Sequence, residues 1–267
     1  MRLIPPAYVK PYVKRQKNDA ADEEAICEAV TRPNMHFVAI KSVDQQAAMM
    51  LHRVRDLLVR QRTMLINALR AHMAELGIIA PQRPQNVLGL VQQLEEDSNG
   101  GITEVARSAL LSLADQLTSL TQEIRALDRK ILEWHRSSET SQRLATIPGV
   151  GVLTATAMAA SVTDPSLFRS GRQFAAFLGL VPRQNSSGGK ERLGRITKMG
   201  DGYLRKLLVV GATAILRRVA DTQTRSANWI RSLLERKAPR LVSVAMANKT
   251  VRIVWALLAR GGTFRAA

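Results

Sequence analysis

Apolar side chains recur at helical spacing in two long stretches of this chain. Between residues 43 and 76 they follow steps of four and three, with a polar Gln61 in the series: Ala47, Leu51, Val54, Leu58, Leu65 and Ala68. Between residues 110 and 134 the steps continue unbroken through Leu110, Leu113, Leu117, Leu120, Ile124, Leu127, Ile131 and Trp134. A repeat of about 3.5 residues keeps one stripe of a helix facing a partner. The pattern predicts two long helices in an antiparallel coiled coil, formed with each other or with a second copy of the chain.

The segments outside these two stretches predict shorter elements. Residues 1–17 place Tyr and Val between prolines, which favours a broken or edge strand. From Asn18 the chain offers a helix cap, an acidic first turn and an alanine-rich continuation, which together predict a helix. A short helical piece is expected near residues 87–94. After Thr140 the chain is punctuated by glycine and mostly helical. We therefore expect a mainly α protein in three parts: residues 1–42, 43–140 and 141–267.

The charge of the chain is concentrated in its last part. Lys and Arg number 39 against 22 Asp and Glu, which gives a net charge of +17. Residues 1–145 hold 19 basic and 17 acidic side chains, whereas residues 146–267 hold 20 basic and 5 acidic ones. Clustered cations gain affinity for phosphates by releasing counterions, so this asymmetry predicts a nucleic-acid surface in the C-terminal part.

The apolar and cysteine content excludes several classes of protein. Cys27 is the one cysteine, so a disulfide scaffold and a cysteine-based zinc site are both excluded. No uninterrupted apolar run approaches the roughly 18 residues that span a bilayer, so no membrane partner is expected. These features predict a cytoplasmic protein, associated with the nucleoid if its partner is DNA.

Two aspartates could hold a metal ion. Asp19 and Asp22 stand at i and i+3, which places them on one face of the predicted helix, close enough to contribute to one Mg²⁺ site. The alternative is that they only complement the helix macrodipole, as Glu23 and Glu24 do in the same turn.

The segment Pro148-Gly149-Val150-Gly151 predicts a tight turn that leads into a helix. Its spacing is that of a helix-hairpin-helix element, in which backbone N–H groups at Gly149 and Gly151 contact a phosphate without reading bases. An ordinary packing corner between two helices is the alternative.

A glycine-rich loop carries two serines among cations. Ser186 and Ser187 precede two glycines, and the surrounding cations suited to DNA phosphates are Arg183, Lys190, Arg192, Arg195, Lys198 and Arg205. A serine here is either a nucleophile or a structural loop residue. A serine hydrolase triad is not supported, because every histidine lies well before this loop.

Five segments resemble, in order, the transposases of the insertion sequence 110 family, also called DEDD transposases. They are RLIPPAYVKPYVKRQKNDAADEEAI near the start, RDLLVRQRTMLINALRAHMAELG in the first long helix, and then LATIPGVGVLTATAMAA, FAAFLGLVPRQNSSGGKERLGRITKMGDGYLR and VAMANKTVRIVWALL. The resemblance covers nearly the whole chain.

The resemblance implies a recombinase in two parts. An RNase H-like (RuvC-like) α/β domain supplies four acidic Mg²⁺ ligands, of which Asp19 and Asp22 match the last two. A coiled coil joins it to a C-terminal domain whose serine attacks DNA; Ser187 matches this nucleophile, with Ser186 as the rival. A structured noncoding RNA guides the choice of DNA, and the protein works as a homo-oligomer.

The chain departs from the family pattern at its start. The family's first Asp and its Glu lie on strands upstream of this segment, and nothing acidic precedes Asp19 here. Residues 1–42 are therefore expected to be a remnant of the RuvC-like domain in an N-terminally truncated chain. Two functions stay open: an active transposase, or a catalytically inactive fragment that binds DNA or RNA and interferes with the intact enzyme.

Overall fold

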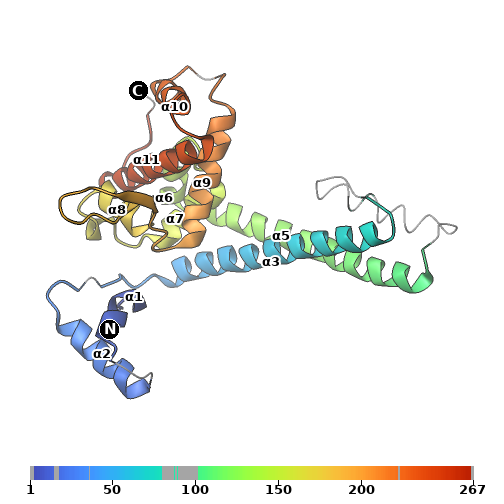
Figure 1. Ribbon diagram of the computed structural model, residues 1–267, viewed down its shortest axis with the longest axis horizontal. Helices are drawn as coiled ribbons and strands as arrows, with labels where there is room; N and C mark the ends of the chain where they lie inside the picture. Colours follow the sequence, from blue (N-terminus) through green and yellow to red (C-terminus); the bar gives the residue numbers. More distant parts are fainter. Residues whose placement is uncertain are drawn as a thin grey trace.

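The described residues form a long helical arm, a C-terminal helical body and a small N-terminal segment (Figure 1). This computed structural model describes residues 3–14, 18–35, 37–79, 87, 89, 102–221 and 223–265. The arm contains α3 (Val43–Glu75) and α5 (Glu104–Ser137). The body contains α6 (Glu139–Ala145), α7 (Val152–Ser161), η2 (Pro165–Leu167), α8 (Gly171–Phe177), β1 (Pro182–Gln184), β2 (Leu193–Ile196), α9 (Gly202–Arg217), α10 (Arg225–Leu234) and α11 (Pro239–Arg260). The prediction of a mainly α protein is confirmed.

The two predicted long helices are present and run side by side in opposite directions. α3 begins with a capping box, in which the N–H of Gln45 donates to Ser42 Oγ and the N–H of Ser42 donates to Gln45 Oε1, both at 3.1 Å. Met73 near the end of α3 shares an apolar cluster with Leu110 near the start of α5. Leu110, Leu117, Ile124 and Ile131 of α5 are all buried, at intervals of seven residues. The predicted repeat of α5 therefore pairs these helices within the chain. The stripe predicted for α3 is wrong by one position, because Ala47 and Val54 are exposed while Ile66, Leu69 and Met73 are buried. The helical piece expected at 87–94 lies almost wholly outside the described residues.

The C-terminal body is built around α11. Figure 1 shows this helix crossing the body, and it packs against α8 and α9. Met158, Phe174, Leu208 and Val251 come from four different helices and are at most 1% exposed. The arm joins the body where the first half of α3 packs on α7.

Among the described helices, α11 is long and apolar enough to cross a membrane by length and composition. Its apolar side is used inside the body: Val242, Ala247, Val251 and Val254 are each at most 1% exposed. This packing is that of a core helix, which explains its composition without a lipid contact.

The edge strand predicted within residues 1–17 is wrong. Residues 6–12 form α1 (Pro6–Val9) and the 3-10 turn η1 (Lys10–Tyr12), since a proline is well suited to the first position of a helical turn. Extended pairing survives at one point, where the N–H of Val38 donates to the carbonyl of Leu3 at 2.8 Å. The helix predicted from Asn18 is confirmed as α2 (Asp19–Thr31), with Asn18 as its cap.

Candidate nucleic-acid interface

The two serines lie at the tip of the only β-hairpin among the described residues. β1 and β2 pair antiparallel, and the N–H of Asn185 donates to the carbonyl of Arg192 at 2.9 Å. The tip closes where the N–H of Lys190 donates to the carbonyl of Ser187 at 3.1 Å. Gly188 and Gly189 between them have φ of 58° and 75°. Two consecutive positive φ values define the tight hairpin turn that glycine adopts without strain. We call residues 182–196 the Ser187 hairpin.

The two hydroxyls differ in their surroundings. Ser186 Oγ accepts a hydrogen bond from the N–H of Arg192 at 3.2 Å, so it helps to hold the hairpin. Ser187 is exposed at the turn, and its hydroxyl has no hydrogen-bond partner among the described residues. Ser187 is therefore the hydroxyl that an external phosphate can approach freely.

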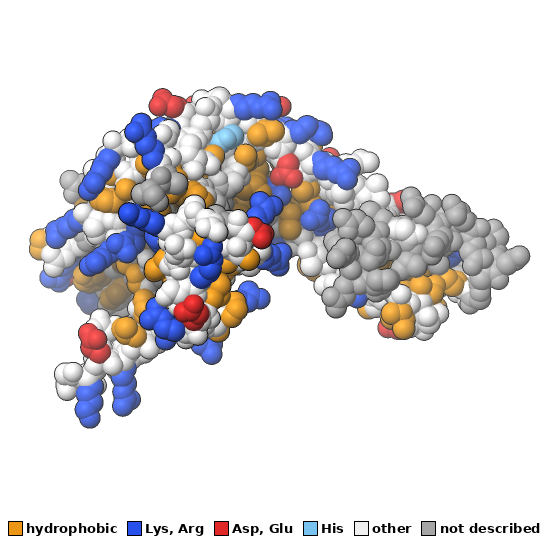
Figure 2. All heavy atoms as spheres, turned by 90° about the horizontal axis from the view of Figure 1, so that it is seen from above, with side chains coloured by type: hydrophobic (Ala, Val, Ile, Leu, Met, Phe, Trp, Pro, Cys, Tyr) orange, Lys and Arg blue, Asp and Glu red, His pale blue; other side chains and the backbone are white. Residues whose placement is uncertain are grey.

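The hairpin and the loop after it present a row of cations. Arg183, Lys190, Arg192, Arg195 and Lys198 are all exposed, and none of them pairs with a carboxylate of a described residue. Figure 2 shows Lys and Arg side chains spread over the visible face of the C-terminal body, with few acidic side chains between them. A surface with so little internal neutralisation attracts polyanions.

Arg205 differs from the other predicted cations. Its guanidinium Nη1 donates to the carbonyl of Leu178 at 2.9 Å and to that of Met199 at 2.8 Å. These bonds tie the end of α8 to the loop that follows the Ser187 hairpin. At Gly200 in this loop, a Cβ would lie 2.0 Å from the carbonyl oxygen of Phe177. The base of the hairpin is therefore fixed to the body, and the Arg205 side chain stabilises this attachment.

The predicted turn at residues 148–151 connects α6 to α7, and its two glycines differ. Gly149 has φ of 79°, and a Cβ there would lie 2.6 Å from Ile215 Cδ1 of α9. Its own carbonyl oxygen would be 2.0 Å from a Cβ at Gly211. Gly149 is thus required by close packing on α9. Gly151 caps α7, is exposed and has open space around it, so its backbone is open to an external phosphate.

Asp19 and Asp22 lie in the first turn of α2. Asp19 is exposed and Asp22 is half-buried, while the Asn18 side chain caps the helix through the N–H of Ala21 at 2.7 Å. α2 packs on α1 and η1, away from the Ser187 hairpin (Figure 1). Within the described ranges, no group of three or more His, Cys, Asp or Glu side chains could hold a metal ion. The aspartate pair and Ser187 are not brought together by contacts of the described residues.

A buried polar cluster at the joint between arm and body was not predicted from the sequence. His52 of α3 is 1% exposed; its Nδ1 lies 2.9 Å from the hydroxyl of Tyr203, and its Nε2 lies 2.9 Å from Thr156 Oγ1. Thr156 already donates its proton to the carbonyl of Val152 at 2.7 Å. Its oxygen therefore accepts from Nε2–H of His52, and Nδ1 accepts from Tyr203. We call His52, Thr156 and Tyr203 the joint triad.

Burial keeps His52 and Tyr203 of the joint triad neutral. Desolvation, with a smaller contribution from the Arg55 charge, lowers the pKa of His52 to about 4. Burial also raises the pKa of Tyr203 to about 12. Arg55 donates to Asp128 of α5 at 2.5 Å, and Lys206 of α9 pairs with Asp56 of α3. The triad thus locks α3 to the body. The sequence signal for this cluster was the spacing of His52, which follows Ala48 by four residues and therefore lies on the same, buried face of α3.

Comparisons with known proteins connect the hairpin and its body to a family. The sequence model described as "Transposase IS116/IS110/IS902 family" matches residues 141–227, which include the turn at 148–151 and the Ser187 hairpin. The match therefore falls on the region whose cations lack carboxylate partners.

Several transposases match nearly the whole of this chain, including the arm and the N-terminal segment. The y4pF/y4sB protein of Sinorhizobium fredii is 46% identical over 268 residues, covering 100% of this chain and 69% of that protein. The transposase of element IS1328 from Yersinia enterocolitica is 40% identical, over 99% of this chain and 78% of that protein. The transposase of IS1111A from Coxiella burnetii is also 40% identical, over 99% and 72%. The chain belongs to the IS116/IS110/IS902 family of insertion-sequence transposases.

Proposed function

We propose that this chain binds DNA through its C-terminal body and cleaves and exchanges DNA strands through Ser187. The observation that carries the proposal is the exposure of the Ser187 hydroxyl on a glycine turn, among cations without carboxylate partners. Backbone and cations that surround a phosphate stabilise the charge that develops at phosphorus during attack. Family membership supports the same reaction class.

The proposed step forms a phosphoserine bond. Ser187 Oγ attacks the phosphorus of a DNA phosphodiester, and the bond from phosphorus to one deoxyribose oxygen breaks. The leaving oxygen takes the electron pair of that bond and ends as a hydroxyl, while the serine proton passes to solvent or to a neighbouring base. The energy of the ester is kept in the covalent link, so a second DNA hydroxyl can displace Ser187 and complete the exchange.

Asp19 and Asp22 are proposed to contribute to a Mg²⁺ site. Their carboxylates are the oxygen donors that this hard cation prefers, and Mg²⁺ in phosphoryl-transfer sites is often bound by one or two carboxylates together with substrate phosphates and waters. The pair therefore fits such a site in donor type and in spacing. When bound, the ion would supply positive charge that neutralises a phosphate held at α2.

A guide RNA and a second copy of the chain are the proposed partners. Lys and Arg side chains are spread widely over the visible face of the body, which supports contacts with a folded RNA as well as with DNA (Figure 2). An exposed apolar stripe on α3 supports oligomerisation: Val43, Met50, Val54, Leu57 and Met64 are each at least 40% exposed. Four of the five stand at intervals of seven residues, which is the spacing that presents one seam to another helix.

The test is a cleavage assay with Mg²⁺, DNA carrying an element end, and the RNA of the element. Ser187→Ala is expected to abolish the covalent protein–DNA adduct, while Ser186→Ala retains it, because Ser186 Oγ serves the hairpin. Both variants should bind DNA as the unmodified chain does. An adduct that persists in Ser187→Ala would refute the nucleophile assignment.

A second candidate function is a binding protein without catalysis. It is favoured by the position of α2, which carries Asp19 and Asp22 and packs on α1 and η1 instead of the hairpin. The same assay separates the two. DNA binding with no adduct from the unmodified chain, under conditions in which an intact relative forms one, would support this second function.

A further inference from the structure

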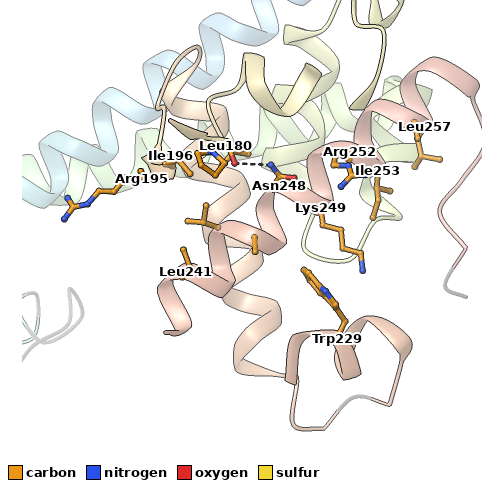
Figure 3. A pocket seen from close by; sticks show the side chains of 15 residues that line it. Leu180, Arg195, Ile196, Trp229, Leu241, Asn248, Lys249, Arg252, Ile253 and Leu257 are labelled. Carbon is orange, nitrogen blue, oxygen red and sulfur yellow. Dashed lines mark hydrogen bonds between the residues drawn. The ribbon is translucent and has the colours of Figure 1, made fainter. Parts of the chain in front are cut away.

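A groove in the C-terminal body shares one wall with the Ser187 hairpin. Figure 3 shows it lined by the hairpin strands, by α11 and by Trp229 of α10. Its volume is about 810 Å³, within the roughly 300–1,000 Å³ of pockets that hold small ligands. Pro182, Gly194 and Ile196, which line the groove, belong to the same hairpin that carries Ser187 at its tip.

The walls combine apolar surface with positive charge. Leu241 and Ile253 of α11 and Ile196 of the hairpin are apolar, and Trp229 lies across from them (Figure 3). Arg252 stands exposed among the lining residues, and no Asp or Glu is found among the described residues of the lining. The groove therefore suits a ligand with a flat apolar part and a negative charge.

The indole of Trp229 is half-buried against the core of the body, and Lys249 lies over its ring. Lys249 Nζ lies 4.4 Å from the centre of the indole ring, which is a cation–π contact. A lysine is a flexible cover, since its ammonium can leave the ring and bind a phosphate while a planar group takes its place on the indole. Asn248, by contrast, is fixed in the groove, where Nδ2 donates to the carbonyl of Leu180 at 3.0 Å.

We infer that this groove binds one unpaired nucleotide of the DNA strand held at the Ser187 hairpin. The base stacks on Trp229, and Lys249 and Arg252 bind the adjoining phosphate. The inference rests on the proposed function, and it adds a single-strand site beside the proposed nucleophile. Aromatic residues make up 4% of the sequence, which does not favour a platform for several bases, but a single base needs one aromatic face.

The distance between Ser187 and the groove is compatible with this assignment. Pro182 lines the groove and is five residues before Ser187, so the two lie at most roughly 18 Å apart even along a fully extended chain. This span equals about five steps of 3.4 Å along a DNA strand. One strand can therefore contact Ser187 and the groove together, provided that the nucleotide in the groove has left its duplex.

The test compares binding of labelled single-stranded DNA, the matching duplex and single-stranded RNA of the same sequence to the full 267-residue chain, in EDTA so that no cleavage occurs. Base stacking on an aromatic side chain contributes about 1–3 kcal/mol, so Trp229→Ala should weaken single-stranded DNA binding about tenfold. Duplex binding should change less than about twofold. Lys249→Gln should lower the slope of log affinity against log salt by about 1.

Two controls separate the groove from general effects. Lys237→Gln removes an exposed cation outside the groove and should leave the preference for single strands unchanged. Trp229→Phe keeps an aromatic face if Trp229→Ala fails to fold; single-stranded DNA should quench the tryptophan fluorescence of the unmodified chain and not that of Trp229→Phe.

Three results would overturn the inference: quenching that persists in Trp229→Phe, equal loss of duplex binding, or dependence on Trp229 with RNA alone. A chain that binds no DNA at all would instead refute the proposed function itself.

Discussion

The joint triad and the Ser187 hairpin use polar side chains in opposite ways. At the joint, His52 is 1% exposed and both of its ring nitrogens have partners on other helices. On the hairpin, Ser187 and the cations around it are exposed, and these cations form no ion pair with a described carboxylate, although Glu191 stands between Lys190 and Arg192. Buried polar groups cost stability unless they are satisfied, whereas exposed and unpaired ones keep their capacity for an external ligand.

This difference separates residues that maintain the fold from residues that are available for DNA. The predicted DNA-binding cations divide in the same way. Arg205 donates to two backbone carbonyls, so it is one of the residues that maintain the fold. The contrast therefore predicts that joint variants lose stability, and that hairpin variants lose function while the protein stays folded.

The largest effect on stability is expected from His52→Ala. The substitution leaves a cavity and an unpaired Tyr203 hydroxyl at the joint, which together cost about 3 kcal/mol. Denaturant unfolding followed by circular dichroism measures this loss. His72→Ala is the matched control on the exposed face of α3, and it should stay within about 0.5 kcal/mol. A His52→Ala chain as stable as the unmodified one would remove the distinction between joint and hairpin.

The same histidine should make stability depend on pH. Its pKa is about 4 in the folded protein against an ordinary value of 6.5, so between these values the unfolded chain binds the proton and the folded chain does not. Stability is therefore complete above pH 6.5 and falls as the pH drops toward 4, by up to roughly 3 kcal/mol. Unfolding midpoints measured across this range should show the slope, and His52→Gln should flatten it. An equal slope in the unmodified chain and in His52→Gln would mean that groups other than His52 cause the pH dependence of stability.

The sequence predicted the helices well because their signals are local. The seven-residue repeat from Leu110 to Trp134 and the cap at Asn18 each specify a helix from neighbouring residues alone. The sequence also marked the Ser187 loop, since two serines and two glycines stand there among several cations.

The failures come from contacts that are distant in sequence. The joint triad joins residues 52, 156 and 203, and the groove joins Trp229 to the hairpin; no spacing along the chain carries such information. At residues 6–12 the β propensity of Tyr and Val gave way to prolines that start helical turns. The packing of Gly149 on α9 was likewise not predictable, because Ile215 lies far along the chain.

An intermediate effect is expected from Gly189→Ala in the hairpin turn. Gly189 has φ of 75° with open space around it, so the cost is backbone strain of about 1 kcal/mol and not a steric clash. The strain loosens the turn that presents Ser187, so adduct formation should slow several-fold while the unfolding midpoint changes little. Gly77→Ala, with a similar φ of 80° and open space at the end of α3, is the control and should leave the rate of adduct formation unchanged. A large shift in the unfolding midpoint would mean that the hairpin is part of the cooperative core.

The smallest effect on stability is expected from removing one hairpin cation. Arg192 stabilises the hairpin through its backbone: its N–H donates to Ser186 Oγ, and its carbonyl accepts from the N–H of Asn185. Arg192→Gln keeps both of these hydrogen bonds. Unfolding free energy should stay within about 0.5 kcal/mol. DNA affinity should fall, and the slope of log affinity against log salt should decrease by about 1, because one phosphate contact is lost. Arg129→Gln, an equal loss of charge on the arm, should change neither quantity. Equal slopes in the two variants would show that net charge alone attracts DNA, and that the hairpin is no more an interface than the arm.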